Sequence, residues 1–324
     1  MIFVTSDNGA LPGDRIQDQS GHLRGCKAHS WEDGHREPFI ARWPSVIKPG
    51  TSSDQLMCST DLMATCAAIV GTDLPENTAE DFWLRKHHFK STFDLADGFI
   101  SPSEFLRQRY IDWGIDENNI VMIENGQADE PTLPARTLND GETRNRFGYF
   151  GQVNPYKGID ILLEALKSMK KGERDSLIVE IHGANLEQQS GEFKEKVQKL
   201  AKKLIKEGCL RWVGPYRPDE QMERMRAIDW VIVPSIWWEN SPMVIQEAFV
   251  AGRPLIVSDI GGMKEKVRDS IDGLHFSARN PVDLASKMLH AAKSSTLWEQ
   301  CSKNIVKPLN YMECAESHIK FFNY

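Results

Sequence analysis

The sequence predicts an α/β protein whose main domain is a doubly wound parallel sheet, and two observations lead to this fold class. From about residue 147, short apolar runs rich in β-forming residues alternate with segments of helical periodicity. Glycine and proline stand at the ends of several helical segments, where they favour termination or initiation. Strands that alternate with helices form a parallel sheet with right-handed crossovers. The ligand of such a sheet binds beyond the carboxyl ends of its strands.

Five apolar runs are predicted as the strands of this sheet. They are Phe147–Gly151, Leu177–Gly183, Leu210–Gly214, Trp230–Ser235 and Pro254–Asp259. Between them, "GIDILLEALKSM" and "EFKEKVQKLAKKLIKEG" each repeat apolar residues on one helical face, and the second ends at Gly208. A third helix, "SPMVIQEAFVAG", is expected to have Ser241 as its N-cap and Pro242 at its first helical position.

The rest of the chain divides into two further parts. Residues 83–127 indicate one more β/α piece, and the polar, proline-containing residues 128–146 are typical of a linker. Residues 1–81 hold 6 basic and 12 acidic residues, whereas the remainder holds 33 and 34, which suggests separate histories. We therefore expect parts at 1–81, 82–146 and 147–324.

Composition excludes several classes of protein. The 324 residues carry a formal net charge of −7, which does not favour nucleic acid as a partner. Six scattered cysteines form no C-x-x-C pair, so a disulfide framework or zinc ribbon is not expected. No apolar run approaches a transmembrane span, and the start "MIFVTSDNG" lacks the features of a signal peptide. We expect a cytoplasmic chain.

Candidate binding residues lie in the loops that follow the predicted strands. Gly151 and Lys157 follow the first strand, where a glycine turn exposes backbone N–H groups and a lysine can neutralise phosphate. Glu239 and Glu247 lie eight positions apart around the start of the third helix. Carboxylates accept bidentate hydrogen bonds from vicinal hydroxyls. In isolation, two such glutamates indicate a solvated helix face; together with Lys157 and the glycine loops, they indicate a nucleotide-sugar site.

Residues 147–290 resemble the donor-binding domain of family 4 retaining glycosyltransferases, which consist of two facing Rossmann-like domains. The resemblance rests on "FGYFGQVNPYKGIDILLEAL", "WVIVPSIWWENSPMVIQEAFVAGRPLIVSDIGG" and "DGLHFSARNPVDLA". It implies that Lys157 binds the donor diphosphate, that Glu239 holds the transferred sugar as the candidate catalytic residue, and that Glu247 binds the ribose. It also implies contacts to the donor from the segment Ser241, Pro242, Met243 and Val244. Gln152 stands where many family members carry arginine.

Residues 83–127, with "ADGFISPSEFLRQRYIDWGI", resemble the last β/α units of the family's acceptor-binding domain. The resemblance implies that most of this domain is missing from the chain. By the family, the expected partner is a UDP- or GDP-sugar, the carbohydrate acceptor is unassigned, and no cofactor is needed.

The amino-terminal "TSDNG" allows two interpretations. Asn8-Gly9 after an apolar strand is a strong signal for a tight hairpin. The following "GHLRGCKAHSWEDGHREPFIARWPSVIKPG" instead resembles the later part of the sulfatase family, with an alkaline-phosphatase-like fold. That resemblance implies Asp7 and Asn8 as ligands of a divalent cation, usually Ca²⁺, and Lys27 as a sulfate contact. No cysteine is followed by x-Pro-Ser-Arg, the segment that supplies the sulfatase nucleophile, so these residues are expected to be vestigial.

The sequence therefore predicts glycosyl transfer from a nucleotide sugar as the parent function. Two alternatives remain open: a remnant of a sulfuric ester hydrolase, which would need the absent nucleophile segment and a complete Ca²⁺ site, and a nucleotide-sugar-binding module without turnover.

Overall fold

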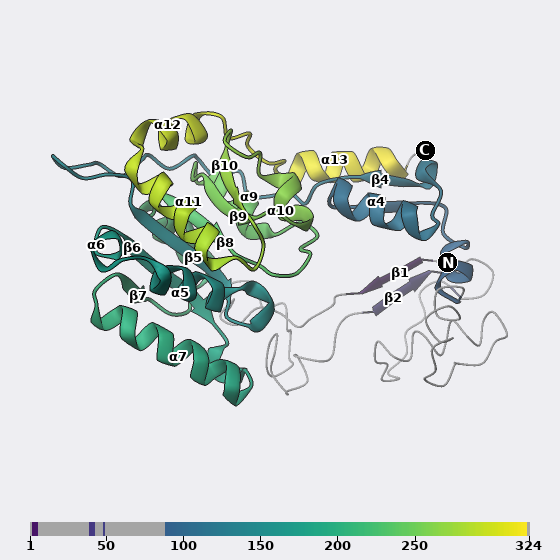
Figure 1. Ribbon diagram of the computed structural model, residues 1–324. Coiled ribbons are helices and arrows are strands. Elements are labelled where there is room, and N and C mark those ends of the chain that lie inside the picture. Colours follow the sequence, from purple (N-terminus) through teal and green to yellow (C-terminus); the bar gives the residue numbers. More distant parts are fainter. Residues whose placement is uncertain (1, 6–38, 43–47, 49–87, 323–324) are drawn as a thin grey trace. The chain divides into compact units, whose positions relative to one another are not determined.

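The computed structural model describes residues 2–5, 39–42, 48 and 88–322 (Figure 1). The chain divides into two compact units. The first unit contains residues 1–99 and 110–121, and the second contains residues 100–109 and 122–324. Each unit is described by itself below.

The second unit is built on a six-stranded sheet with the order β10-β9-β8-β5-β6-β7. All of its strand pairs with a recorded register are parallel. The strands are β5 (Arg146–Gln152), β6 (Ile178–Ala184), β7 (Leu210–Trp212), β8 (Trp230–Val233), β9 (Leu255–Ser258) and β10 (Gly273–Phe276). The chain runs outward from β5 to β7 and then returns to the other side of β5 with β8. The strand order therefore reverses between β5 and β8, which makes this the topological switch point.

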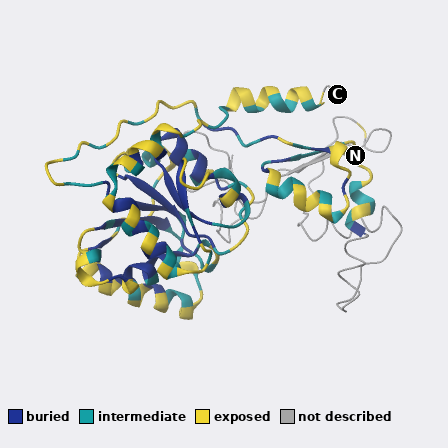
Figure 2. Cartoon of the chain, turned by 45° about the horizontal axis from the view of Figure 1, so that its top comes forward, coloured by how far each residue is buried: buried dark blue, intermediate teal, exposed yellow. Residues whose placement is uncertain are grey.

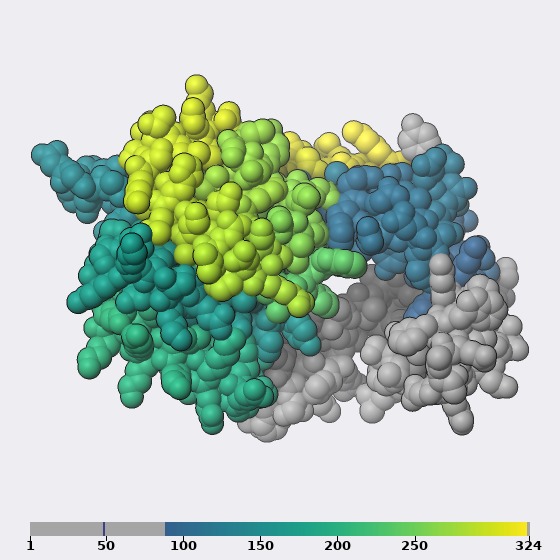
Figure 3. Space-filling model, viewed as in Figure 1, coloured from purple at the N-terminus to yellow at the C-terminus, as the bar shows by residue number. Residues whose placement is uncertain are grey.

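Helices cover both faces of the sheet, as the alternation of strands and helices predicts. The helices of the second unit are α5 (Ile159–Ser168), α6 (Lys171–Arg174), α7 (Gly191–Lys206), α8 (Gln221–Arg226), α9 (Met243–Val250), α10 (Gly261–Lys266), α11 (Pro281–Lys293), α12 (Ser295–Lys303) and α13 (Tyr311–Phe322). In Figure 3, α11 and α12 form the outer surface on the face turned toward the viewer.

Two hydrophobic cores lie on opposite faces of this sheet, and Figure 2 shows the buried strands between the exposed helices. Trp230 and Ile232 of β8 belong to the core that α5, α7 and α11 cover. Val231 and Val233 belong to the second core, with apolar side chains from α8, α9 and α10. Alternate residues of one strand thus bury side chains in different cores, because successive side chains in a strand point to opposite faces. The predicted doubly wound fold is confirmed.

The predicted strands are all present, but the sheet contains one strand more. β10 (Gly273–Phe276) lies at the edge of the sheet beside β9. It lies within "DGLHFSARNPVDLA", a segment that supports the family resemblance but was not predicted as a strand. Its run is short and contains His275, so the apolar pattern is weak. Gly273 permits close packing there, because a Cβ at this position would lie 2.5 Å from the carbonyl oxygen of Leu255.

The expected N-cap of the third helix is wrong by one position. α9 begins at Met243, and its N-cap is Pro242, which has extended backbone angles. The ψ of Pro242 is 116°, which is extended rather than helical, so the helix starts one residue later than expected. Gly208, by contrast, follows the C-cap of α7 with φ of 84°, the left-handed conformation expected of a glycine after a helix.

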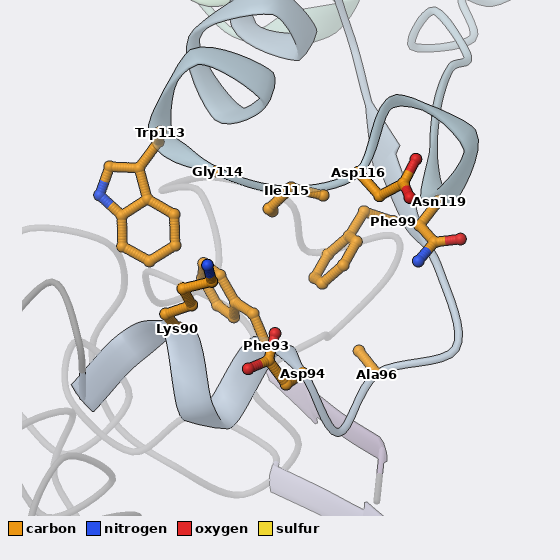
Figure 4. Close-up of a pocket in the computed structure, with 10 residues that line it drawn as sticks. All are labelled: Lys90, Phe93, Asp94, Ala96, Phe99, Trp113, Gly114, Ile115, Asp116 and Asn119. Atoms are coloured by element: carbon orange, nitrogen blue, oxygen red, sulfur yellow. The ribbon is translucent and has the colours of Figure 1, made fainter.

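The region around residues 83–127 contains the expected β/α elements. They are helical residues 88–93, β3 (Phe99–Ser101), α4 (Glu104–Trp113) and β4 (Ile120–Met122), and β3 pairs with β4. In the first unit, aromatic rings gather around Phe93, with centroids 5.4 Å from Trp113 and 5.5 Å from Phe99. A pocket of about 280 Å³ lies among these side chains (Figure 4).

Two short antiparallel strands are described near the amino terminus. β1 (Ile2–Thr5) pairs with β2 (Phe39–Arg42), with Thr5 opposite Phe39. This pairing joins segments far apart in sequence. The tight hairpin considered at Asn8-Gly9 lies outside the described residues. The candidate sulfatase residues Asp7, Asn8 and Lys27 lie outside the described residues.

Candidate nucleotide-sugar site

β5 and β8 are neighbours at the switch point of the sheet (Figure 1). Charged side chains from the loops that follow these two strands form an ion pair. The Lys157 ammonium lies 2.6 Å from Oε1 of Glu239. The Glu239 side chain is largely buried, at 11% exposure, whereas Lys157 is 36% exposed. The pair therefore combines a partly accessible cation with a carboxylate held in a fixed position, at the place where ligands of doubly wound sheets bind.

Lys157 is positioned by a tight turn that ties the two loops together. Asn154 caps the 3₁₀ turn Pro155–Lys157, and its side-chain oxygen accepts hydrogen bonds from the backbone of Tyr156 and Lys157, each at 3.0 Å. Gly158 follows with φ of 68°, and a Cβ there would lie 1.9 Å from the carbonyl oxygen of Pro234. Only glycine fits this position, because both the backbone conformation and the close approach exclude a side chain.

Glu239 is held from both its side chain and its backbone. The Ser235 hydroxyl donates to Oε1 at 2.7 Å, and the Gly262 N–H donates to the Glu239 carbonyl at 2.7 Å. Gly262 lies at the start of α10, and a Cβ there would lie 2.1 Å from the carbonyl oxygen of Asn240. The loop that carries Glu239 thus packs directly on the first turn of α10. A group held this firmly costs little ordering entropy when a ligand binds.

Glu247 lies in α9 and has a different partner from Glu239. Gln221 of α8 donates its side-chain N–H to Glu247 Oε2 at 2.6 Å. Burial raises the pKa of Glu247 above its ordinary value. Burial and the nearby charge of Glu247 also raise the pKa of Tyr216. Glu239 and Glu247 are therefore held by different partners.

The remaining predicted site residues surround these groups. No atom lies within 4 Å of a Cβ built on Gly151, so there is space for a side chain. Glycine is favoured there because φ is 134°, a conformation that other residues rarely adopt. The Ser241 hydroxyl is buried and has no hydrogen-bond partner among the described residues. Such an unsatisfied group is costly unless a ligand or water pairs with it. Pro242 is buried as the N-cap of α9, Met243 is exposed, and Val244 packs partly against the second core.

Sequence reasoning assigned no role to Asn154, Ser235, Gln221 and Gly262, which hold the loops and side chains of the site. His182 lies near the end of β6. The His182 ring stacks on Phe150 with centroids 4.4 Å apart, and its Nε2 lies 3.2 Å from Glu180 Oε2. Its Nδ1 is buried without a partner within the described part of the chain. The small-residue turn "HGAN" after β6 was the available signal for this position, but the stacking partner comes from another strand.

The described residues contain neither a cluster of metal ligands nor a membrane-spanning helix. No group of three or more His, Cys, Asp or Glu side chains in these ranges could hold a metal ion. No helix in the described part of the chain combines the length and apolar character needed to cross a membrane.

Comparison with protein families assigns the class that this fold and site define. The family model described as "Glycosyl transferases group 1" matches residues 135–307, more than half of the chain. The chain therefore belongs to this glycosyltransferase family. A second model, "Sulfatase", matches residues 1–72, so the chain also contains a short amino-terminal sulfatase fragment.

Individual relatives show both resemblances. The chain is 31% identical over 303 residues to a D-inositol 3-phosphate glycosyltransferase of Streptomyces bingchenggensis, a match that covers 88% of this chain and 62% of that protein. It is 42% identical over 106 residues to an arylsulfatase of Hemicentrotus pulcherrimus, covering 32% of this chain and 17% of the arylsulfatase. The chain thus spans about three fifths of the glycosyltransferase's length and a small part of the arylsulfatase's.

A solved structure shares the fold. Anabaena Alr3699/HepE, in complex with UDP and glucose, matches with a TM-score of 0.60 at 18% identity, covering 82% of this chain and 75% of that one. At this identity the likeness shows the fold alone.

Proposed function

We propose that the chain transfers a sugar from a nucleotide-sugar donor to an acceptor hydroxyl, with retention of the anomeric configuration. The observation that carries this proposal is the Lys157–Glu239 pair at the switch point, at 2.6 Å. UDP-sugars are the first donors to test, since the Anabaena structure contains UDP and glucose. The sulfatase alternative is not pursued, because the Sulfatase family model matches only residues 1–72 and the arylsulfatase match covers only 17% of that enzyme.

Each site residue has a role in this proposal. Lys157 exchanges its carboxylate partner for the donor diphosphate and neutralises the negative charge that grows on the leaving phosphate oxygen. Glu239 accepts hydrogen bonds from the hydroxyls of the transferred sugar, and Glu247 accepts them from the ribose. Backbone N–H groups beside Gly151 and the buried hydroxyl of Ser241 supply further donors to the phosphates or the sugar. The family resemblance implies that the transfer needs no metal ion.

The reaction breaks the bond between the sugar's anomeric carbon and the diphosphate oxygen. A bond forms from the acceptor oxygen to the same carbon, and the acceptor proton leaves with the departing phosphate or enters solvent. The nucleoside diphosphate and the glycosylated acceptor are the products.

Calorimetry with UDP, GDP and UDP-glucose tests donor binding, and release of free nucleotide in the presence of candidate acceptors tests turnover. Saturable binding of one nucleotide and its sugar, followed by acceptor-dependent nucleotide release, is the expected result. Binding without release under any acceptor would leave the alternative of a binding module. No binding of any nucleotide would reject the proposal.

A further inference from the structure

A surface hollow of about 690 Å³ lies beside the proposed donor site, and all of its lining residues belong to the second unit. Its main lining side chains are Phe105, Arg109, Tyr156, Trp237, Trp238 and Arg279. Three of these are large and well exposed: Tyr156 at 60%, Trp237 at 55% and Trp238 at 57%. Exposed aromatic side chains gathered at one place mark a binding surface more often than chance exposure.

Residues that flank the ion pair in the chain line the hollow. Tyr156 precedes Lys157 in the chain, and Trp238 precedes Glu239. The Tyr156 carbonyl accepts from the Ile236 N–H at 2.9 Å, so the two loops that carry the ion pair also carry these rings. The rings of Tyr156 and Trp237 lie 5.8 Å apart with a tilt of 47°. The loops that carry the ion pair therefore also form part of the wall of the hollow.

Trp238 is fixed by its neighbours. Its ring packs on the edge of Phe105 at 5.8 Å, and the Arg109 guanidinium lies 5.4 Å from the centre of the same ring. Phe105 is fixed in turn, because the Glu265 carboxylate accepts from its backbone N–H at 2.5 Å. These contacts hold the aromatic wall in place before a ligand arrives, which lowers the entropy cost of binding.

The chemistry of the wall suits a saccharide. One face of a pyranose ring presents C–H groups with partial positive charge, and the face of an aromatic ring carries the complementary negative quadrupole. The ring hydroxyls of the saccharide stay hydrated at the rim of such a site. Aromatic side chains with a few polar groups beside them are the usual lining of a small-ligand pocket.

The charged residues that line the hollow are both arginines. The nine residues that line the hollow, all of them within the described part of the chain, include Arg109 and Arg279 and no aspartate or glutamate. Arg279 is exposed, and its backbone adopts φ of 64°, a left-handed conformation that is costly for a residue with a side chain. One guanidinium nitrogen donates to the Ile236 carbonyl at 3.3 Å, which leaves other N–H groups of the fork to donate to a ligand.

We propose that this hollow binds the acceptor, and that the acceptor is a saccharide with an anionic substituent. A pyranose stacks on Trp237 and Tyr156, and its carboxylate or sulfate accepts hydrogen bonds from Arg279. This inference rests on the proposed function, since the acceptor hydroxyl must lie beside the donor sugar at Glu239.

A matched pair of probes tests it on the full chain: an oligosaccharide that contains uronic acid, and the same oligosaccharide after reduction of its carboxyl groups. We expect the acidic form to bind about tenfold more tightly, as one charge-assisted hydrogen bond implies. Arg279→Gln should remove this preference without changing the affinity for the neutral form, and Arg279→Lys should restore part of it. Trp237→Ala should weaken both forms.

UDP affinity, measured on the same variants, separates this inference from the proposed function. Unchanged UDP binding by Arg279→Gln and Trp237→Ala would show that the variants are folded and that the donor site is intact. If the parent chain binds UDP but neither oligosaccharide, or binds both forms equally, the acidic-acceptor inference is wrong while the donor proposal stands. A sulfated, carboxyl-reduced oligosaccharide identifies which anion is preferred. Absence of binding of both UDP and GDP would reject the proposed function itself.

Discussion

Lys157 and Glu239, which are 82 positions apart in the sequence, form a 2.6 Å ion pair between the loops that follow two neighbouring strands of the sheet. The pair links the predicted phosphate contact to the predicted sugar contact before any donor is bound. If Lys157 binds the donor diphosphate as proposed, Glu239 competes with phosphate for the same ammonium group. This competition gives definite expectations for variants at both positions.

Replacement of Glu239 should weaken the binding of a nucleotide sugar but not the binding of the free nucleotide. In Glu239→Ala we expect UDP-glucose to bind about tenfold more weakly, because a charged hydrogen-bond acceptor for sugar hydroxyls is lost. UDP itself should bind as well as before or slightly more tightly, since Lys157 loses its competing partner. Calorimetry with both ligands measures this. Glu239→Gln, which keeps an acceptor for Ser235, is the shape control. Equal losses for UDP and UDP-glucose would show that Glu239 does not contact the sugar.

Replacement of Lys157 should act on the diphosphate. In Lys157→Ala we expect UDP affinity to fall about ten- to a hundredfold, whereas uridine, which has no phosphate, should lose little. Lys307→Ala is a matched control, because Lys307 also pairs with a carboxylate, that of Asp129, but on the exposed surface. Comparison of UDP and uridine in a competition assay gives the result. A loss that is the same for both ligands would place Lys157 away from the phosphates.

Gly262 should be essential for the loop that carries Glu239. A methyl group at this position would lie 2.1 Å from the Asn240 carbonyl oxygen and 2.7 Å from that of Glu239, so the loop must move. We expect Gly262→Ala to lower the free energy of unfolding by about 1–3 kcal/mol, the usual cost of overpacking, and to weaken UDP-glucose binding.

The control for this substitution is Gly172→Ala in α6, where no atom lies within 4 Å of the added methyl group. Thermal unfolding of both variants compares their stabilities. If Gly262→Ala is as stable as the parent chain and binds UDP-glucose equally well, the loop tolerates the displacement.

Glu247 should give the stability a specific pH dependence. Burial raises the pKa of this carboxyl above its value in the unfolded chain. The unfolded state therefore releases the proton more easily, and the contribution of Glu247 to stability is present at low pH and lost as the pH rises through the folded pKa. We expect Glu247→Gln to raise the melting temperature at pH 7 and to raise it less near pH 4, the ordinary range of a glutamate.

Melting curves of the parent chain and of Glu247→Gln across this pH range measure the effect. The glutamine side chain keeps an oxygen that can accept the hydrogen bond from Gln221. A stabilisation that does not change with pH would mean that the ionisation of Glu247 is not its cause.

The strands and helices of the second unit were predictable because their signals are local. β8 is an uninterrupted apolar run, and the apolar residues of α5 repeat with the helical period. β10 lacked such a signal, since a four-residue strand at the sheet edge has too little pattern to stand out. Ser241 was misplaced as a cap because Pro242 adopts an extended conformation instead of the helical one that proline favours at a first helical position.

The sequence by itself determined the fold class, the family and the residue types of the donor site, since Lys157, Glu239 and Glu247 stand in a recognisable order around predictable strand ends. Only the tertiary structure decided which of them meet. The strand order places β8 beside β5, and no short-range sequence pattern encodes this order. Because the two strands are neighbours, Lys157 meets Glu239 and Tyr156 meets Trp237. The physical reason is that helices and strands depend on nearby residues, whereas the site depends on packing between loops that are distant along the chain.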